Sequence, residues 1–260
     1  MQERHLNRKK YFEELSITSQ KYYIPYLTQH FELTPECSIL EIGCGDGGNL
    51  LPFAQYGCKV TGIDISINRI KQAQDFFLEA GLKAQLIASD IFKIDDFGKL
   101  FDIIIMHDVI EHIADKEKLL KQLKIYVKDN GIIFIGFPAW QMPFGGHQQT
   151  CRNKIISHLP FIHLLPNPIY KTLLKAGNEI PEKVEELLDI KSCQISVEHF
   201  RNLSNNTGYD IQKETLYFIN PHYEIKFGLK PRKLSPILSH IPYIRNYFTT
   251  SAFFLLKKHI

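Results

Sequence analysis

Short apolar runs alternate with amphipathic segments along residues 37–137. The apolar runs predict strands, and the intervening segments, whose apolar residues recur every three or four positions, predict helices. The second of these helices is well marked, because Ser66 suits its N-terminal cap and Gly81 its C-terminal exit. Alternating strands and helices are typical of a parallel sheet with crossover helices. Strands are expected at residues 38–42, 59–65, 84–88, 101–106 and 132–137, and helices near 48–56, 66–80 and 115–127.

The run at residues 101–106 is apolar at nearly every position, which predicts a strand buried on both faces at the centre of the sheet. Asn130 and Gly131 predict a turn that leads into the next strand. Ahead of the alternating region, residues 11–36 are rich in tyrosine and predict helical material that covers the core.

The alternation breaks twice after residue 137. Residues 138–195 interrupt it first, and a helix at 196–207 and a strand at 210–218 follow; residues 219–249 interrupt it again before a last strand at 251–257. We therefore expect a helical cover (1–36), a core (37–137), a lid insertion (138–195) and a C-terminal part (196–260). That last part completes the sheet and carries a second lid insertion, residues 219–249.

The composition of the 260 residues, 44% hydrophobic and 23% charged, is that of a folded globular protein. Its five cysteines form no CxxC pair, which predicts neither a disulfide framework nor a zinc site. The charged stretch 1–10 does not look like a secretory signal, and no apolar run approaches the roughly 20 residues that span a bilayer. A cytoplasmic location follows as the expectation.

The net charge of +3 is unevenly distributed. Residues 138–178 carry +4 and residues 219–260 carry +6, so the rest of the chain carries −7. The two basic segments coincide with the two interruptions of the fold pattern, so the charge is expected to lie on the lids.

A glycine-rich turn, Glu41-Ile42-Gly43-Cys44-Gly45-Asp46-Gly47, directly follows the first strand. Glycine lets a ligand approach the backbone closely, because it lacks a Cβ. A purely structural turn and a dinucleotide site are the alternatives, although the glycine spacing differs from the GxGxxG that holds a pyrophosphate. Asp64 ends the second strand, where a carboxylate can accept hydrogen bonds from ribose hydroxyls, or can instead cap the next helix.

Two further polar segments follow strands: Ser89-Asp90-Ile91 after the third and His107-Asp108-Val109-Ile110-Glu111-His112 after the fourth. All these positions fall at the carboxyl edge, where open α/β sheets bind ligands. With its LEIGCGDG turn and its D-x-x-E-H segment, residues 37–137 resemble the class I methyltransferases that depend on S-adenosylmethionine (SAM), of the type 11, 12 and 23 groups.

The resemblance implies a Rossmann-like, doubly wound α/β fold of seven strands with an antiparallel C-terminal hairpin and insertions that form a lid. It implies SAM as methyl donor and S-adenosylhomocysteine (SAH) as product. Gly43 and Gly45 would pass under the methionine part of SAM, Asp64 would hold the ribose, and Asp90 would hold the adenine amino group. The remaining donor-site residues that it implies are Glu41 in support of the turn, Cys44, Ile65, Ile91 against the adenine, and the backbone carbonyl of His107.

Methyl transfer from a sulfonium requires alignment of the acceptor and exclusion of water, and it requires no metal, so no metal ligands are predicted. A hydroxyl acceptor needs a general base near the methyl group. The possible bases are Asp108, Glu111, His112 and His147, of which the two histidines are favoured because an imidazole pKa near 6.5 suits proton removal. A nicotinamide oxidoreductase and a SAM-binding module without catalysis remain as alternatives.

Both predicted lids are aromatic as well as basic, which suggests an acceptor with an apolar body and an anionic group. The aromatic residues could instead form the lids' own small cores, and the basic ones a solvated face. A membrane surface is a third interpretation, because Lys226, Lys230, Arg232 and Lys233 precede an apolar stretch. Nucleic acid is not expected, and the sequence predicts no oligomeric state. The apolar lid residues are Trp140, Met142, Phe144, Phe161, Leu164, Leu165, Tyr170, Tyr223, Phe227, Tyr243 and Tyr247.

Overall fold

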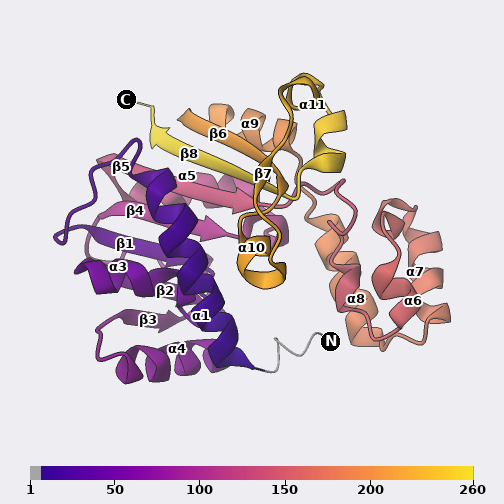
Figure 1. The fold of residues 1–260 in the computed structure, drawn as a ribbon, viewed down its shortest axis with the longest axis horizontal. Coiled ribbons are helices and arrows are strands. Elements are labelled where there is room, and N and C mark those ends of the chain that lie inside the picture. The colour runs from indigo at the N-terminus through magenta and orange to yellow at the C-terminus, as the bar shows by residue number, and fades with distance from the viewer. Residues whose placement is uncertain (1–6, 260) are drawn as a thin grey trace.

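A single eight-stranded sheet forms the centre of the molecule in a computed structural model that describes residues 7–259 (Figure 1). Its strand order is β3-β2-β1-β4-β5-β8-β6-β7. Strands β1 to β5 run parallel, and β8 pairs antiparallel with both β5 and β6. The predicted doubly wound sheet with an antiparallel C-terminal hairpin is confirmed. The strands are β1 Ser38–Ile42, β2 Lys59–Asp64, β3 Gln85–Ala88, β4 Phe101–His107, β5 Val127–Phe137, β6 Tyr209–Ile219, β7 Arg232–Lys233 and β8 Ser251–Lys258.

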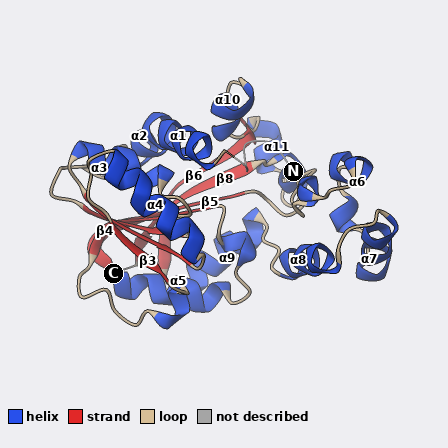
Figure 2. Ribbon diagram, turned by 90° about the horizontal axis from the view of Figure 1, so that it is seen from below, coloured by secondary structure: helices blue, strands red, loops and turns tan. Residues whose placement is uncertain are grey.

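Helices cover both faces of the sheet, as Figure 2 shows. One face packs on side chains of α1 to α4, and the other on side chains of α5 and α9. Strand β4 lies between these layers with Ile103 to Met106 fully buried, as its unbroken apolar run predicts. The helices are α1 Arg8–Thr18, α2 Ile24–Leu27, α3 Leu51–Tyr56, α4 Ile67–Glu79, α5 Lys116–Tyr126, α6 Lys154–His158, α7 Asn167–Ala176, α8 Pro181–Ser192, α9 Val197–Asn206, α10 His222–Phe227 and α11 Pro236–His240.

The N-terminal cover consists of α1, a π-helical turn at Ser19–Tyr23, and α2. Pro25, which has no N–H to donate, lies just after the π-helical turn, so the irregularity of this continuous helical run falls where its hydrogen-bond ladder is interrupted. The helical material ends at Leu27, earlier than the predicted limit of residue 36. Residues 1–6 of the predicted cover, and residue 260 of the predicted C-terminal part, lie outside the described residues.

Two strand predictions need correction. Strand β5 begins at Val127, so Asn130 and Gly131 lie within its bounds, in the irregular stretch between the pairs Val127–Phe101 and Ile132–Ile103, and not in a turn before it. A Cβ at Gly131 would lie 2.9 Å from the carbonyl oxygen of Asp102, so this glycine permits close strand contact. The second correction is an eighth strand, β7, which pairs with the outer edge of β6. Its two residues are too few to give a periodic pattern in the sequence.

The two interruptions leave the sheet at the carboxyl ends of β5 and β6, which is the same edge. The first folds into α6, α7 and α8, which lie beyond that edge in Figure 1 and share a small core around Trp140, Tyr170 and Leu187. The second contributes α10, β7 and α11. Among residues 7–259, no helix is long and apolar enough to cross a membrane.

Glu198 in α9 ties the second interruption to the body. Its carboxylate accepts hydrogen bonds from the Tyr243 N–H at 2.8 Å, Arg245 Nε at 2.8 Å and Asn246 Nδ2 at 2.6 Å. Burial acts against the charged form, but these three donors outweigh it and lower the pKa of Glu198 to about 2. This segment is therefore held by a charged hydrogen-bond network in addition to apolar packing.

Candidate functional site

A cavity of about 610 Å³ opens at the carboxyl ends of β1 to β4. This is the edge at which the sequence predicts the ligand site, and every strand there contributes lining residues. Seven of the predicted site residues line the cavity: Gly43, Asp64, Ile65, Asp90, Ile91, Asp108 and His112.

The glycine-rich turn has the backbone conformation that only glycine adopts readily. Gly43, Gly45 and Gly47 have φ values of +69°, +54° and +82°. A Cβ on Gly43 would also collide with Cγ2 of Val109 from the loop after β4. The turn is fixed by hydrogen bonds from Gly43 N and Cys44 N to the carbonyl oxygen of Ile63, at 2.8 and 3.0 Å. The glycines therefore bring two loops into contact at the cavity wall.

Asp64 joins this turn to the next helix. Its Oδ2 accepts a hydrogen bond from Gly45 N at 2.9 Å, and its Oδ1 accepts one from Ser66 N at 2.8 Å. Each carboxylate oxygen has a second lone pair, so both can accept a further donor from a ligand. The carboxylate is half-buried at the cavity wall, which suits a ribose contact.

Asp90 and the isoleucines form the opposite wall. Oδ1 of Asp90 caps the short turn Ile91–Lys93 by accepting a hydrogen bond from Phe92 N at 3.0 Å. Ile91 is buried, whereas the side chain of Ile65 is 76% exposed at the cavity mouth. Exposed apolar surface beside polar acceptors suits a flat, amphipathic ring such as adenine.

Four predicted donor-site residues, Glu41, Cys44, Gly45 and His107, do not line the cavity. Glu41 is buried behind the turn and accepts a hydrogen bond from Asn49 Nδ2 at 2.7 Å. Burial raises the pKa of Glu41 to about 8, so it is largely protonated at neutral pH. The ring of His107 stacks on Tyr23 at 4.9 Å between centroids. The part that these residues play in donor binding stays a prediction.

Asp108 stands at the junction of β4 and the following loop. Its backbone is left-handed, with φ +55°, and its carboxylate lies 3.3 Å from His107 Nδ1. Desolvation acts to raise the pKa of Asp108, but the neighbouring His107 outweighs it, so the pKa lies below its ordinary value. Asp108 thus brings a negative charge to the cavity at neutral pH.

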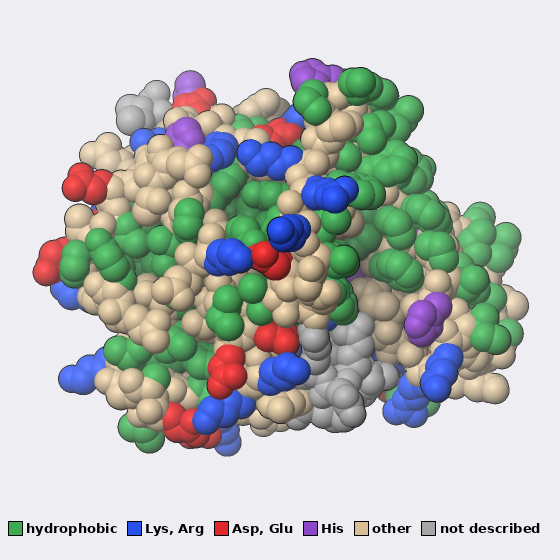
Figure 3. All heavy atoms as spheres, in the orientation of Figure 1, with side chains coloured by type: hydrophobic (Ala, Val, Ile, Leu, Met, Phe, Trp, Pro, Cys, Tyr) green, Lys and Arg blue, Asp and Glu red, His purple; other side chains and the backbone are tan. Residues whose placement is uncertain are grey.

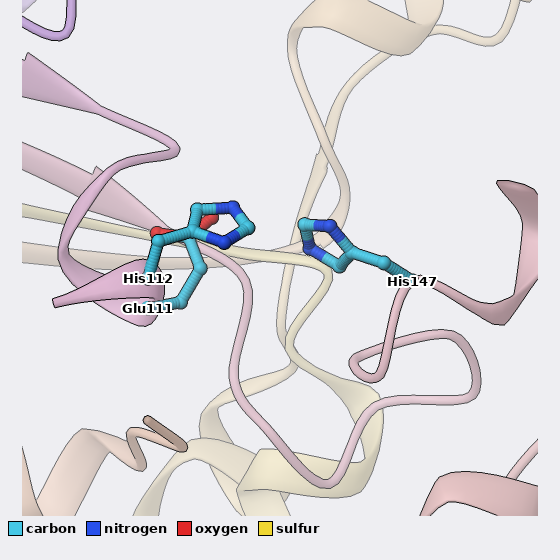
Figure 4. Close-up of side chains that lie close together, drawn as sticks. All are labelled: Glu111, His112 and His147. Atoms are coloured by element: carbon cyan, nitrogen blue, oxygen red, sulfur yellow. The ribbon is translucent and has the colours of Figure 1, made fainter. Parts of the chain in front are cut away.

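His147 reaches back from the first interruption to the loop after β4. Its ring lies 4.9 Å from that of His112, centroid to centroid, at an interplanar angle of 78°. One ligand atom each from Glu111, His112 and His147 lies within 4.8 Å of the other two. Figure 4 shows the two imidazoles pointing toward one another from separate segments, with Glu111 beside His112. Burial, followed by the neighbouring His112, lowers the pKa of His147 to about 4.

The sequence pattern predicts these three residues separately as possible bases and does not predict that they form a cluster. Nor does it predict Arg69, which lines the cavity. A Cβ on Gly45 would lie 3.5 Å from Nη1 of Arg69, so this guanidinium faces the glycine-rich turn. Its position could have indicated this, because Arg69 lies in the first turn of the helix that follows Asp64. That turn begins at the carboxyl edge of the sheet, where the ligand site is predicted.

A second cavity, of about 680 Å³, lies between the two interruptions. Phe144, Arg152 and Lys154 line it from the first interruption, and Tyr223 and Phe227 from the second. The predicted combination of aromatic and basic side chains is therefore present in one cavity. Other aromatic residues of the first interruption, such as Trp140 and Tyr170, pack instead in the small hydrophobic core of that segment.

An apolar patch covers the outside of the second interruption. Figure 3 shows hydrophobic side chains gathered over α11 and the chain that follows it. Ile237 is 78% exposed and Tyr243 is 69% exposed, and Ile244, Tyr247 and Phe248 are exposed as well. Such a patch is larger than the single exposed apolar residues of ordinary protein surfaces.

Comparison with known proteins gives a family match. A family model described as a methyltransferase domain matches residues 11–160. A ubiquinone biosynthesis O-methyltransferase from Rickettsia canadensis is 29% identical over 205 residues, which are 72% of this chain and 84% of that relative. The protein of the same name from Bartonella bacilliformis is 31% identical over 53% of this chain, and the match spans only 58% of its length.

Solved structures with the same fold span nearly the whole chain. The plantazolicin methyltransferase BpumL, solved in complex with SAH, superposes with a TM-score of 0.55 over 97% of this chain and 84% of its own, at 19% identity. A SAM-dependent methyltransferase from Clostridium acetobutylicum gives a TM-score of 0.60 over 96% of this chain and 92% of its own, at 12% identity. At these identities the likeness concerns the fold.

Proposed function

Since the chain belongs to the methyltransferase-domain family of class I SAM-dependent methyltransferases, we propose that it transfers the methyl group of SAM to a hydroxyl oxygen of an amphiphilic, anionic small molecule. The observation that carries this proposal is the pair of cavities at one edge of the sheet, one lined by the predicted donor residues and one by aromatic and basic lid residues. The names of the relatives support oxygen as the methylated atom. Neither the family nor the glycine spacing favours the nicotinamide alternative.

SAM occupies the first cavity in this proposal. Asp64 accepts hydrogen bonds from the ribose, Asp90 binds the adenine amino group, and Ile91 contacts the ring. The methionine part lies over Gly43 and Gly45, where the nearby Arg69 can pair with its carboxylate. Glu41 and Cys44 support the turn from behind, Ile65 closes the mouth, and the His107 carbonyl accepts from the donor's ammonium.

The acceptor hydroxyl points at Asp108, His112 and His147. The oxygen loses its proton to this cluster, attacks the methyl carbon in line with the carbon–sulfur bond, and leaves the bonding pair on sulfur to give SAH. The lowered pKa of His147 keeps its imidazole neutral at pH 7 but makes it a weak base. An acidic hydroxyl, such as that of a phenol, is therefore the acceptor that this cluster suits best.

The body of the acceptor occupies the second cavity. Phe144 and Phe227 contact its apolar part, while Arg152 and Lys154 pair with its anionic group. Tyr223 also lines the second cavity, where burial, and then the charge of Asp108, raise the pKa of its phenol.

We further propose that the protein takes its amphiphilic acceptor from a membrane surface. The exposed apolar patch with Ile237 and Tyr243 contacts the lipid, and Lys230 and Lys233 attract anionic headgroups. Co-sedimentation with phosphatidylcholine vesicles, with and without phosphatidylglycerol, tests this contact. We expect binding only to the anionic vesicles and its loss in an Ile237→Ser, Tyr243→Ser variant; failure of the wild type to bind at low salt would contradict it.

Methyl transfer itself is tested with methyl-tritiated SAM and three matched long-chain phenols. One carries a carboxylate, the second carries an amide in its place, and in the third the phenol of the carboxylate compound is blocked as a methyl ether. We expect label in the carboxylate phenol, less in the amide and none in the ether. Label in the ether would show transfer to another atom. SAH binding without transfer to any phenol would favour the SAM-binding module that has lost catalysis.

A further inference from the structure

We propose that Glu111, His112 and His147 bind one divalent transition-metal ion beside the methyl donor. Their ligand atoms lie within 4.8 Å of one another. Two ligands of one zinc ion, each about 2.1 Å from it, are up to roughly 4 Å apart, so small side-chain rotations suffice to close the site. Figure 4 shows that the two rings approach from opposite sides of the gap between them.

The carboxylate of Glu111 is the observation that most strongly indicates a bound cation. The residue is only 5% exposed, and neither carboxylate oxygen has a hydrogen-bond partner among the described residues. The neighbouring Lys116 ammonium donates instead to the carbonyl oxygens of Ile113 and Cys193. A buried, unpaired carboxylate is costly, and a cation that bound it would remove that cost.

The two histidine ligands are held in place by their own segments. His147 has a left-handed backbone, with φ +57°, and follows Gly145 and Gly146. A Cβ on Gly145 would collide with the Trp140 carbonyl and one on Gly146 with His163, so this loop packs tightly on the lid core. His112 lies in the short turn Ile110–His112 and lines the donor cavity. A site with preset ligands loses little entropy when the ion binds.

The donor set indicates the class of ion. Two imidazole nitrogens and one carboxylate oxygen suit zinc, iron(II), manganese(II) or cobalt(II) better than calcium or magnesium. Three protein ligands leave at least one position for water or for an acceptor hydroxyl.

The chemical role of the ion rests on the proposed function, whereas the site itself does not. A divalent ion bound there would stabilise the deprotonated acceptor oxygen, and Asp108, the member of the proposed base cluster that does not bind the ion, would take the hydroxyl proton. The oxygen then forms its bond to the methyl carbon as the carbon–sulfur bond breaks.

Metal binding is tested on tag-free, full-length protein that has been stripped with a chelator and titrated with cobalt(II) and zinc(II). We expect one equivalent to bind, with visible absorption bands for cobalt. His147→Asn keeps a residue that tolerates the left-handed backbone, and Glu111→Gln keeps the shape of the carboxylate. Each should weaken metal affinity at least about tenfold, while His240→Ala, at an exposed position in α11, should not.

The result that would overturn the proposal is no stoichiometric binding, or binding that neither His147→Asn nor Glu111→Gln weakens. Circular dichroism and SAH affinity of both variants show whether they have folded. Methyl transfer is measured separately with and without chelator. Full activity in chelator would remove the catalytic role of the ion and leave methyl transfer to oxygen intact.

Discussion

The imidazoles of His112 and His147 lie 4.9 Å apart although one follows β4 and the other belongs to the lid insertion after β5. His112 also lines the donor cavity. The contact therefore joins the loop after β4 to the first interruption. In the proposed reaction both rings face the acceptor, so the proposed chemistry depends on how the first interruption folds.

Gly43→Ala should abolish tight SAH binding and destabilise the fold by about 1–3 kcal/mol. The added Cβ is strained at φ +69° and collides with Val109. Gly81→Ala is the matched control, because Gly81 has φ +66° but nothing within 4 Å of the added Cβ. Calorimetry and urea unfolding measure both effects. Equal SAH affinity and equal unfolding free energy in the two variants would show that the contact with Val109 is unimportant. The double variant Gly43→Ala, Val109→Ala should recover part of the SAH affinity and stability that Gly43→Ala loses.

Glu41→Gln should stabilise the protein at pH 8 and leave its stability at pH 4 unchanged. The folded pKa of about 8 exceeds the ordinary value of 4.5, so the folded state binds more protons between these values. The wild type therefore loses stability as the pH rises from about 4.5 to 8, by at most about 1.4 kcal/mol per unit. Gln retains the acceptor for Asn49. If the unfolding free energies of the variant and the wild type change equally with pH across this range, Glu41 is not buried in its neutral form.

Glu198→Gln should cost about 3 kcal/mol of unfolding free energy at pH 7. The folded pKa of about 2 lies below the ordinary 4.5, so this contribution is present above pH 4.5 and is lost as the pH falls through 2. Urea unfolding from pH 7 to pH 3 measures the difference between variant and wild type. The difference should shrink below pH 4.5; a constant difference would mean that the Arg245 and Tyr243 contacts do not depend on charge.

Arg152→Ala should raise the KM of an anionic acceptor by up to about fivefold with little change in kcat, because it removes one ion pair made by an exposed side chain at the second cavity. Lys171→Ala, at an exposed position in α7, is the control for the loss of one positive charge. Steady-state kinetics with the carboxylate and amide phenols separate the two effects. A KM that rises equally for both phenols would place the anionic group elsewhere.

The core of the fold was predictable because each of the strands β1 to β5 corresponds to a separate apolar run in the sequence. Asp64 and Asp90 were predictable for the same reason, since each follows a strand and parallel strands end at one edge. Strand β7 was not predictable, because its pairing depends on the edge of β6 and its own residues, Arg232 and Lys233, carry no strand pattern.

The cluster at Glu111 could not be predicted from local pattern. It depends on the return of residues 138–147 toward the sheet, in a segment whose Trp140 packs with Tyr170 in a separate small core. The positive charge of a segment indicates that its side chains contact water or an anion, but it does not indicate which cavity those side chains line. Only the fold of both interruptions brings Arg152 and Phe227 to one place.

Titration calorimetry with SAH tests the central claim most directly, on the wild type, Asp64→Ala and Asp75→Ala. We predict that the wild type binds SAH and not NAD, and that Asp64→Ala weakens SAH binding by about 1–3 kcal/mol through lost charged hydrogen bonds. Asp75→Ala, at an exposed position in α4, should bind as the wild type does. NAD binding in place of SAH, or an unchanged SAH affinity in Asp64→Ala, would contradict the account.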